Sequence, residues 1–219
     1  MKFLKSIIIT LIFFLLGTTG VNALENNENS YKVLIDPGHG GYDGGTKSKN
    51  GTLEKDINLQ ISLKLKDILK NKGYNVSMTR EDDIALANKK IEDLNLRCKM
   101  KKETDCDIFI SIHQNAFKTG NTKGLQVWYS NNEKSKNLAE SIQLSVKEQL
   151  QNNNNRVAKN AKNDYKILRD GYDGGSIIVE CGFLSNYEDE QNLKNDEYHN
   201  KLVEAITIGI EKYFSEKHQ

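Results

Sequence analysis

The chain has 219 residues, of which 37% are hydrophobic and 28% charged, and its formal net charge is +1. This composition is typical of a globular protein, and the length favours one domain that is large enough to bury a core. The near balance of charge lacks the basic excess of nucleic-acid-binding proteins, so we expect no nucleic-acid partner.

Residues 1–23 have the pattern of a secretory signal. Lys2 and Lys5 precede the apolar run SIIITLIFFLLG, and small residues follow up to a cleavage point after Ala23. The alternative is an uncleaved membrane anchor, for which the run is short. We expect an exported protein with a polar linker over 24–30 and one domain over 31–217.

The domain alternates apolar strands with amphipathic helices. Strands are predicted at 31–36, 74–80, 106–113, 124–130, 165–170 and 176–183, and helices at 54–73, 84–102, 133–151 and 196–214. This alternation is typical of a mostly parallel sheet with helices on both faces. The three cysteines have no CxxC spacing, so a disulfide scaffold and a thiolate zinc site are not expected, although a Cys98–Cys106 bridge stays open.

Chemistry-bearing residues follow three of these strands. His39 lies on the glycine-rich turn IDPGHGGYDGG, His113 ends IFISIH, and Glu180 ends IIVE. In a parallel sheet the carboxyl ends of the strands share one edge, where ligands bind. Glu54 opens the helix after the first turn and can return to that edge. Two imidazoles and a carboxylate form a catalytic zinc set, and a second carboxylate can serve as general base.

Each of these residues also has a purely structural interpretation. A histidine at a strand end is commonly a hydrogen-bonded turn residue, and Glu54 could be only a carboxylate favoured by a helix N-terminus. Glu180 could be paired with a lysine. Their coincidence at one edge of the sheet favours the catalytic interpretation. His199 and His218 lie in the last helix and the tail, and no role is assigned to them.

Five motifs in order give the chain a resemblance to the zinc-dependent N-acetylmuramoyl-L-alanine amidases. They are IDPGHGGYDGG, LEKDINL, MTREDD, FISIHQNA and VECGFLSN, and they span the chain from about Val33 to Phe214. The resemblance implies a three-layer α/β/α fold around a six-stranded sheet. It also implies one Zn²⁺ held by His39, Glu54 and His113, with Glu180 as the catalytic glutamate.

The resemblance extends to the compact amidases of sporulation and germination. The chain lacks the inserted helix that covers the zinc in some relatives, and it has no proline before the VE strand. It therefore looks like enzymes that remove peptides from the muramic acid of the spore cortex so that muramic lactam can form. The resemblance implies a protein located in the cell wall or the forespore intermembrane space. Asn115 and Arg169 are candidate substrate contacts, and Asp36 is a candidate to orient an imidazole.

Two alternatives and one question of control stay open. The chain could be an inactive wall-binding module of the same fold, or a metallopeptidase that acts on free peptides. The loop between His39 and Glu54 is rich in glycine and poor in apolar residues, so ordering it costs conformational entropy. We therefore expect weak zinc binding by the isolated protein, and an exported or lipid-anchored partner that strengthens it.

Overall fold

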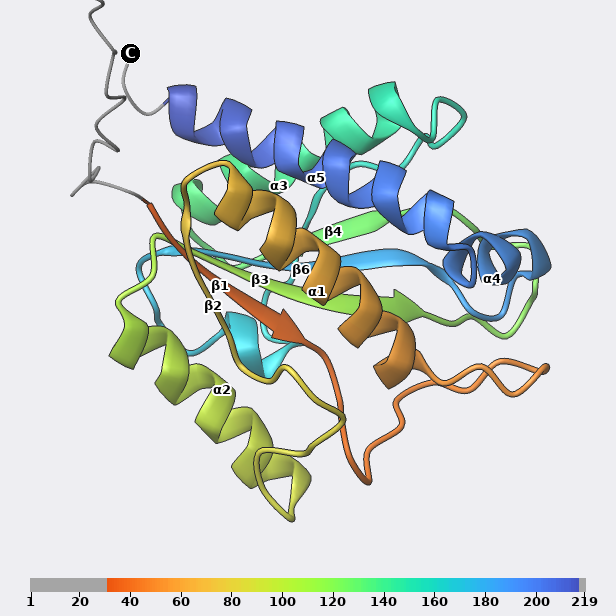
Figure 1. The fold of residues 1–219 in the computed structure, drawn as a ribbon, viewed down its shortest axis with the longest axis horizontal. Helices are drawn as coiled ribbons and strands as arrows, with labels where there is room; N and C mark the ends of the chain where they lie inside the picture. Colours follow the sequence, from red (N-terminus) through yellow and green to blue (C-terminus); the bar gives the residue numbers. More distant parts are fainter. Residues whose placement is uncertain (1–30, 217–219) are drawn as a thin grey trace, which may run out of the picture.

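A computed structural model describes residues 31–216, which form a six-stranded sheet between two layers of helices (Figure 1). The strand order is β2-β1-β3-β6-β4-β5. The strands are β1 (Lys32–Pro37), β2 (Asn75–Met78), β3 (Ile108–Asn115), β4 (Gln126–Tyr129), β5 (Lys159–Asn160) and β6 (Gly175–Phe183). The helices are α1 (Glu54–Asn71), α2 (Lys90–Thr104), α3 (Glu133–Gln149), the short 3₁₀ helix η1 (Lys166–Leu168), α4 (Tyr187–Leu193) and α5 (Asp196–Glu216).

Alternate residues of the central strands enter two separate cores. One core lies under α1, α3 and α5 and contains the side chains of Ile110 and Val179, for example. The other lies under α2 and η1 and contains Phe109 and Ile178. Strands buried on both faces explain the continuous apolar runs in the sequence, and the predicted three-layer fold is confirmed.

The direction of the strands brings the ends of β1, β3 and β6 to one edge of the sheet. β1, β2, β3 and β6 are parallel, whereas β4 runs antiparallel to β6 and places Gln126 opposite Glu180. The start of β4 therefore lies at the edge where β6 ends. We call this edge, where β1, β3 and β6 end, the carboxyl edge.

The structure corrects two of the predicted elements and adds two that were not predicted. The second helix begins at Lys90 instead of residue 84, because residues 84 and 85 pack against the glycine turn: Ile84 O would lie 2.2 Å from a Cβ atom at Gly40. The expected strand over 165–170 contains η1, and the outer strand is Lys159–Asn160, which is too short to show a sequence pattern. The helix Tyr187–Leu193 was also missed.

Other expectations have mixed outcomes. All three cysteines are free, so the optional Cys98–Cys106 bridge is absent, and Cys181 is fully buried. The secretory signal, the linker over 24–30 and His218 lie outside the described residues. Between residues 31 and 216, no helix has the length and apolar character that crossing a membrane requires.

Candidate metal centre and active site

The turn after β1 brings His39 to the carboxyl edge in a strained backbone conformation. His39 has a φ of +61°, in the left-handed region that side chains with a Cβ atom rarely adopt. Gly38 lies so close to the ring of His113 that a Cβ atom there would be 2.2 Å from Cε1. The glycine before His39 therefore permits close approach of β1 and β3.

Two buried arginines hold the carbonyl groups of this turn. Arg97, on α2, donates to Pro37 O at 2.9 Å and to His39 O at 2.8 Å. Arg80, which follows β2, donates to Pro37 O and Gly38 O, each at 3.0 Å. The exposed fractions of Arg80 and Arg97 are only 3% and 2%. These charge-assisted hydrogen bonds offset the backbone strain at His39.

Glu54, His39 and His113 converge on a single oxygen atom. Glu54 Oε1 lies 3.3 Å from His39 Nε2 and 2.9 Å from His113 Nδ1. Glu54 is the first residue of α1, and its other oxygen, Oε2, accepts a hydrogen bond from the backbone N–H of Thr46 at 2.8 Å. One potential ligand atom from each of the three residues lies within 4.8 Å of the others. The structure thus brings the three predicted ligands together.

The electrostatics of this group favour a carboxylate flanked by imidazoles. Burial raises the pKa of Glu54, but hydrogen bonds from His113 and His39 outweigh burial and hold that pKa well below its usual range. Burial lowers the pKa of His39, but the hydrogen bonds and charges of Glu54 and Asp43 outweigh it, so the pKa is raised. An ionised carboxylate beside two imidazoles is a donor set that suits Zn²⁺.

Glu180 lies next to this group but has a different environment. It is paired with His113 in the parallel ladder of β3 and β6, so both side chains lie on the α2 face of the sheet. Its Oε2 atom is buried and has no hydrogen-bond partner among the described residues. Burial raises the pKa of Glu180 to about 7. An unpaired carboxyl group with such a pKa suits a general base or acid.

Asp36 does not orient an imidazole as the sequence suggested. Its fully buried carboxylate accepts hydrogen bonds from Thr79, Ser111 and Arg97 at 2.6, 2.6 and 2.5 Å. The carboxylate on His39 is that of Asp43, which lies 2.9 Å from Nδ1. Asp43 belongs to the same glycine-rich turn, and its spacing of four residues from His39 was a signal that sequence reasoning passed over. Asp36 instead provides the counter-charge for Arg97.

The two candidate substrate contacts have different positions. Asn115 ends β3 at the carboxyl edge, where its side chain accepts a hydrogen bond from Ala116 N at 2.7 Å. Arg169 follows η1 and lines a pocket with Ser130 and Asp173, next to the start of β6. That pocket lies at the opposite edge of the sheet, so the structure does not bring Arg169 to the metal centre.

The loop between His39 and Glu54 is held by α4, which sequence reasoning missed. Glu190 accepts hydrogen bonds from Ser48, Asn50 and Thr52 at 2.6, 2.7 and 2.9 Å. Burial raises the pKa of Glu190, but these hydrogen bonds outweigh it and lower the pKa. The loop therefore has polar contacts in place of the apolar ones that its sequence lacks.

A mostly parallel α/β sheet with two histidines and a glutamate beside a buried, unpaired glutamate is a layout suited to a metal-dependent hydrolase. Comparison with known proteins identifies the family. Residues 33–212 match the N-acetylmuramoyl-L-alanine amidase family named Amidase_3, and the chain belongs to this family.

Individual relatives agree with this assignment. A germination-specific N-acetylmuramoyl-L-alanine amidase of Bacillus subtilis is 35% identical over 197 residues, which cover 84% of this chain and 80% of the relative. A probable cell wall amidase LytH of Staphylococcus epidermidis is 32% identical over 84% of this chain and 58% of its own length. The CwlD amidase from Clostridioides difficile, solved in complex with the GerS lipoprotein, has a TM-score of 0.81 and 36% identity over 85% of this chain and 99% of that chain.

Proposed function

We propose that this protein hydrolyses the amide bond between N-acetylmuramic acid and L-alanine in peptidoglycan, with one Zn²⁺ held by His39, Glu54 and His113. The observation that carries the proposal is the convergence of these three side chains beside the unpaired carboxyl group of Glu180. When bound, Zn²⁺ would supply Lewis acidity that polarises the amide carbonyl and lowers the pKa of a water molecule.

The chain's own residues supply positioning and proton transfer. Arg80 and Arg97 fix the turn that carries His39, and Asp43 holds the imidazole through Nδ1. Glu180 takes a proton from the attacking water and passes it to the nitrogen of the leaving L-alanine. Its unpaired, buried oxygen leaves the carboxylate free for this role, because no described residue competes for it.

Digestion of purified peptidoglycan tests the activity. We expect mass spectrometry to detect released stem peptides with a free L-alanine amine, and Glu180→Gln to reduce their formation by about 10²–10⁴-fold while zinc content is retained. His39→Ala, Glu54→Ala and His113→Ala should each lose most of the zinc. A variant of these three that kept stoichiometric zinc and the wild-type rate would remove that residue from the ligand set.

The same experiment separates the alternatives. A wall-binding module of this fold would bind peptidoglycan without releasing stem peptides. A metallopeptidase would cleave a sugar-free peptide as fast as the matching muramoyl peptide. The intact group of three ligands and Glu180 favours the amidase over the inactive module.

We further propose a role in the spore cortex, with peptide removal that allows muramic lactam to form. The germination-specific relative supports this role, because the chain spans most of that relative. Export to the cell wall or the forespore intermembrane space follows from the proposed substrate and from the predicted signal over 1–23. Loss of muramic lactam from cortex digests of a deletion strain, restored by wild type and not by Glu180→Gln, is the expected result.

An exported or lipid-anchored partner belongs to the same proposal. The related CwlD amidase was solved with a lipoprotein. In this chain, three exposed aromatic side chains lie on segments that follow β1, β3 and β6, with exposed fractions of 59% for Tyr42, 58% for Phe117 and 73% for Tyr187. Such side chains suit a protein contact at the carboxyl edge. Protein purified with its membrane-bound partner should contain more zinc than protein purified alone, and equal zinc contents would contradict this role.

A further inference from the structure

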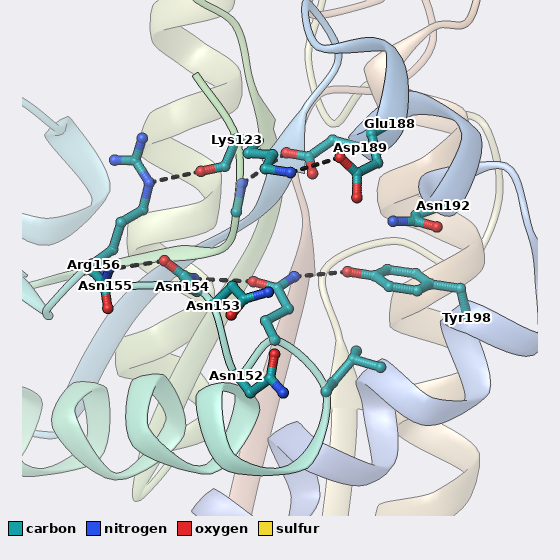
Figure 2. Close-up of a pocket in the computed structure, with 13 residues that line it drawn as sticks. Lys123, Asn152, Asn153, Asn154, Asn155, Arg156, Glu188, Asp189, Asn192 and Tyr198 are labelled. Atoms are coloured by element: carbon teal, nitrogen blue, oxygen red, sulfur yellow. Dashed lines mark hydrogen bonds and ion pairs between the residues drawn. The ribbon is translucent and has the colours of Figure 1, made fainter. Parts of the chain in front are cut away.

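Figure 2 shows a second pocket, whose lining includes none of His39, Glu54, His113 and Glu180. It lies at the carboxyl edge. It has a volume of about 490 Å³, within the range of small-molecule sites. Its lining comes from the chain entering β4, the loop after α3, and residues of α4 and α5. Because β4 is antiparallel to β6, the chain that enters β4 lies at the edge where β6 ends.

The pocket wall is rich in amide side chains that can bond to peptide groups. These side chains are Gln151, Asn152, Asn153, Asn154, Asn155 and Asn192. Asn154 is buried and fixed, since its side chain donates to Leu125 O at 2.8 Å and accepts from Arg156 N at 3.0 Å. The loop that carries Arg156 is therefore held in place next to β4.

Of the two cationic side chains that line the pocket, Arg156 has no ion pair among the described residues, whereas Lys123 has one. Lys123 pairs with Glu188 at 2.6 Å, and Asp189 Oδ2 accepts hydrogen bonds from Gly124 N and Phe183 N at 2.9 and 2.8 Å. Arg156 Nε donates to Lys123 O at 3.0 Å, and its guanidinium lies over the ring of Phe183, 4.8 Å from the centroid. No described residue accepts a hydrogen bond from its Nη2 group.

Arg156 also lies close to the candidate catalytic residue. Its Nη1 atom is 3.5 Å from Oε1 of Gln126, the residue directly opposite Glu180 in the β4–β6 ladder. Opposed residues in antiparallel strands share a face of the sheet and have Cβ atoms about 5 Å apart. The guanidinium therefore contacts the side chain that neighbours Glu180 on the same face of the sheet.

We infer that Arg156 binds a carboxylate on the peptide side of the substrate and that the pocket holds this stem peptide. The inference rests on the proposed function, because the scissile amide must lie at Glu180. The sugars next to that amide are neutral, whereas the stem peptide carries carboxylates. The planar guanidinium matches a carboxylate through two parallel hydrogen bonds. Arg156 thus selects a free α-carboxylate on the residue after L-alanine.

Two muramoyl dipeptides test this selection, one with a free α-carboxylate on the second residue and one with an α-carboxamide there. Binding is measured calorimetrically to Glu180→Gln, which should leave both uncleaved, and turnover is measured with the zinc-loaded wild type. We expect the acid to bind about tenfold more tightly than the amide and kcat/KM to favour the acid by a similar factor. Arg156→Gln, introduced into Glu180→Gln and into the wild type, should bring both ratios to within about twofold of one. It should do so by weakening the interaction with the acid peptide and not that with the amide peptide.

Arg169→Gln is the matched control, because Arg169 lies at the opposite edge of the sheet. It should leave the preference for the acid unchanged. The inference is overturned if the starting protein binds neither peptide or binds both equally, if Arg156→Gln keeps the preference, or if Arg169→Gln removes it. Failure of the wild type to cleave either peptide, with the binding preference intact, would contradict the proposed activity and leave the assignment of Arg156 supported.

Discussion

The carboxyl group of Glu180 lies where ionisation is unfavourable in the metal-free protein. Its pKa is raised by burial to about 7, from an ordinary value of 4.5. A carboxyl group with a raised folded-state pKa binds its proton more tightly in the folded protein, so stability is lost as pH rises from about 4.5 to about 7. Above that window the ionised group destabilises the fold by up to about 3 kcal/mol.

Glu180→Gln should therefore stabilise the metal-free protein at pH 8 relative to wild type and should have a much smaller effect at pH 4.5. Denaturant unfolding in the presence of a chelator, at both pH values, measures the difference. Glu204→Gln, at an exposed position on α5, is the control for loss of a carboxylate as such. An equal effect of Glu180→Gln at the two pH values would contradict the raised pKa.

Arg97 shows how the turn that carries a proposed ligand, His39, is held by a residue of another element. It reaches from α2 to the carbonyl groups of Pro37 and His39, and it neutralises the fully buried Asp36. Arg97→Met should lower the free energy of unfolding by about 3–5 kcal/mol, because it leaves Asp36 as a buried charge without its partner. Urea unfolding of the purified variant measures this loss.

The double variant Arg97→Met/Asp36→Asn separates the buried charge from the hydrogen bonds to the turn. Removing the charge of Asp36 should recover part of the stability, whereas the carbonyl group of His39 still lacks its donor. Zinc affinity should therefore stay below that of wild type in the double variant. Recovery of zinc affinity together with stability would show that Arg97 acts only as a counter-charge.

The contact between α4 and the loop that joins His39 to Glu54 leads to a prediction about local order. Glu190→Ala removes the acceptor shared by Ser48, Asn50 and Thr52, so amide hydrogen exchange over residues 46–53 should become faster. Glu188→Ala is the matched control on the same helix, because Glu188 pairs with Lys123 instead of the loop. Equal exchange in the two variants would mean that Glu190 does not order the loop. Because hydrogen bonding lowers the pKa of Glu190, its contribution is lost as pH falls through that lowered pKa.

The sequence predicts some parts of the site and not others for physical reasons. The convergence of His39, His113 and Glu180 was predictable because strand ends of a parallel sheet converge, and strands leave a clear apolar pattern. Glu54 was placed beside them because it opens the helix that follows the first turn. Arg80 and Arg97 were missed because their partners are backbone carbonyl groups, which no sequence spacing marks. Glu190 and Arg156 were missed because they contact residues that are distant in sequence and meet them only through tertiary packing. The elements β5 and α4 were missed because they are too short to give a periodic signal.

At the scale of the whole molecule, different kinds of element hold the two halves of the candidate metal centre. The rigid strands β3 and β6 present His113 and Glu180, whereas His39 and Glu54 depend on a turn with positive φ and on a loop that only polar contacts hold. Hydrogen bonds hold this half of the candidate metal centre in place of apolar packing, so we expect it to open before the strands do. Metal affinity is lowered by the fraction of molecules in which that half is disordered.

We therefore expect the isolated protein to bind Zn²⁺ with an apparent Kd weaker than about 10⁻⁶ M, which corresponds to less than about 8 kcal/mol. Structural zinc sites reach about 10–16 kcal/mol, so the difference is measurable by calorimetric titration. Glu190→Ala should weaken binding further, because it releases the loop between the two ligands, whereas Glu188→Ala should not. Thermal unfolding at one fixed zinc concentration should rank the proteins in the same order of zinc affinity. At 100 times the Kd of the wild type, zinc adds about 2.7 kcal/mol to the free energy of unfolding of the wild type. Tight, stoichiometric zinc binding by the isolated wild type, with full activity on peptidoglycan, would show that the loop is ordered without help and that no partner is needed to complete the site.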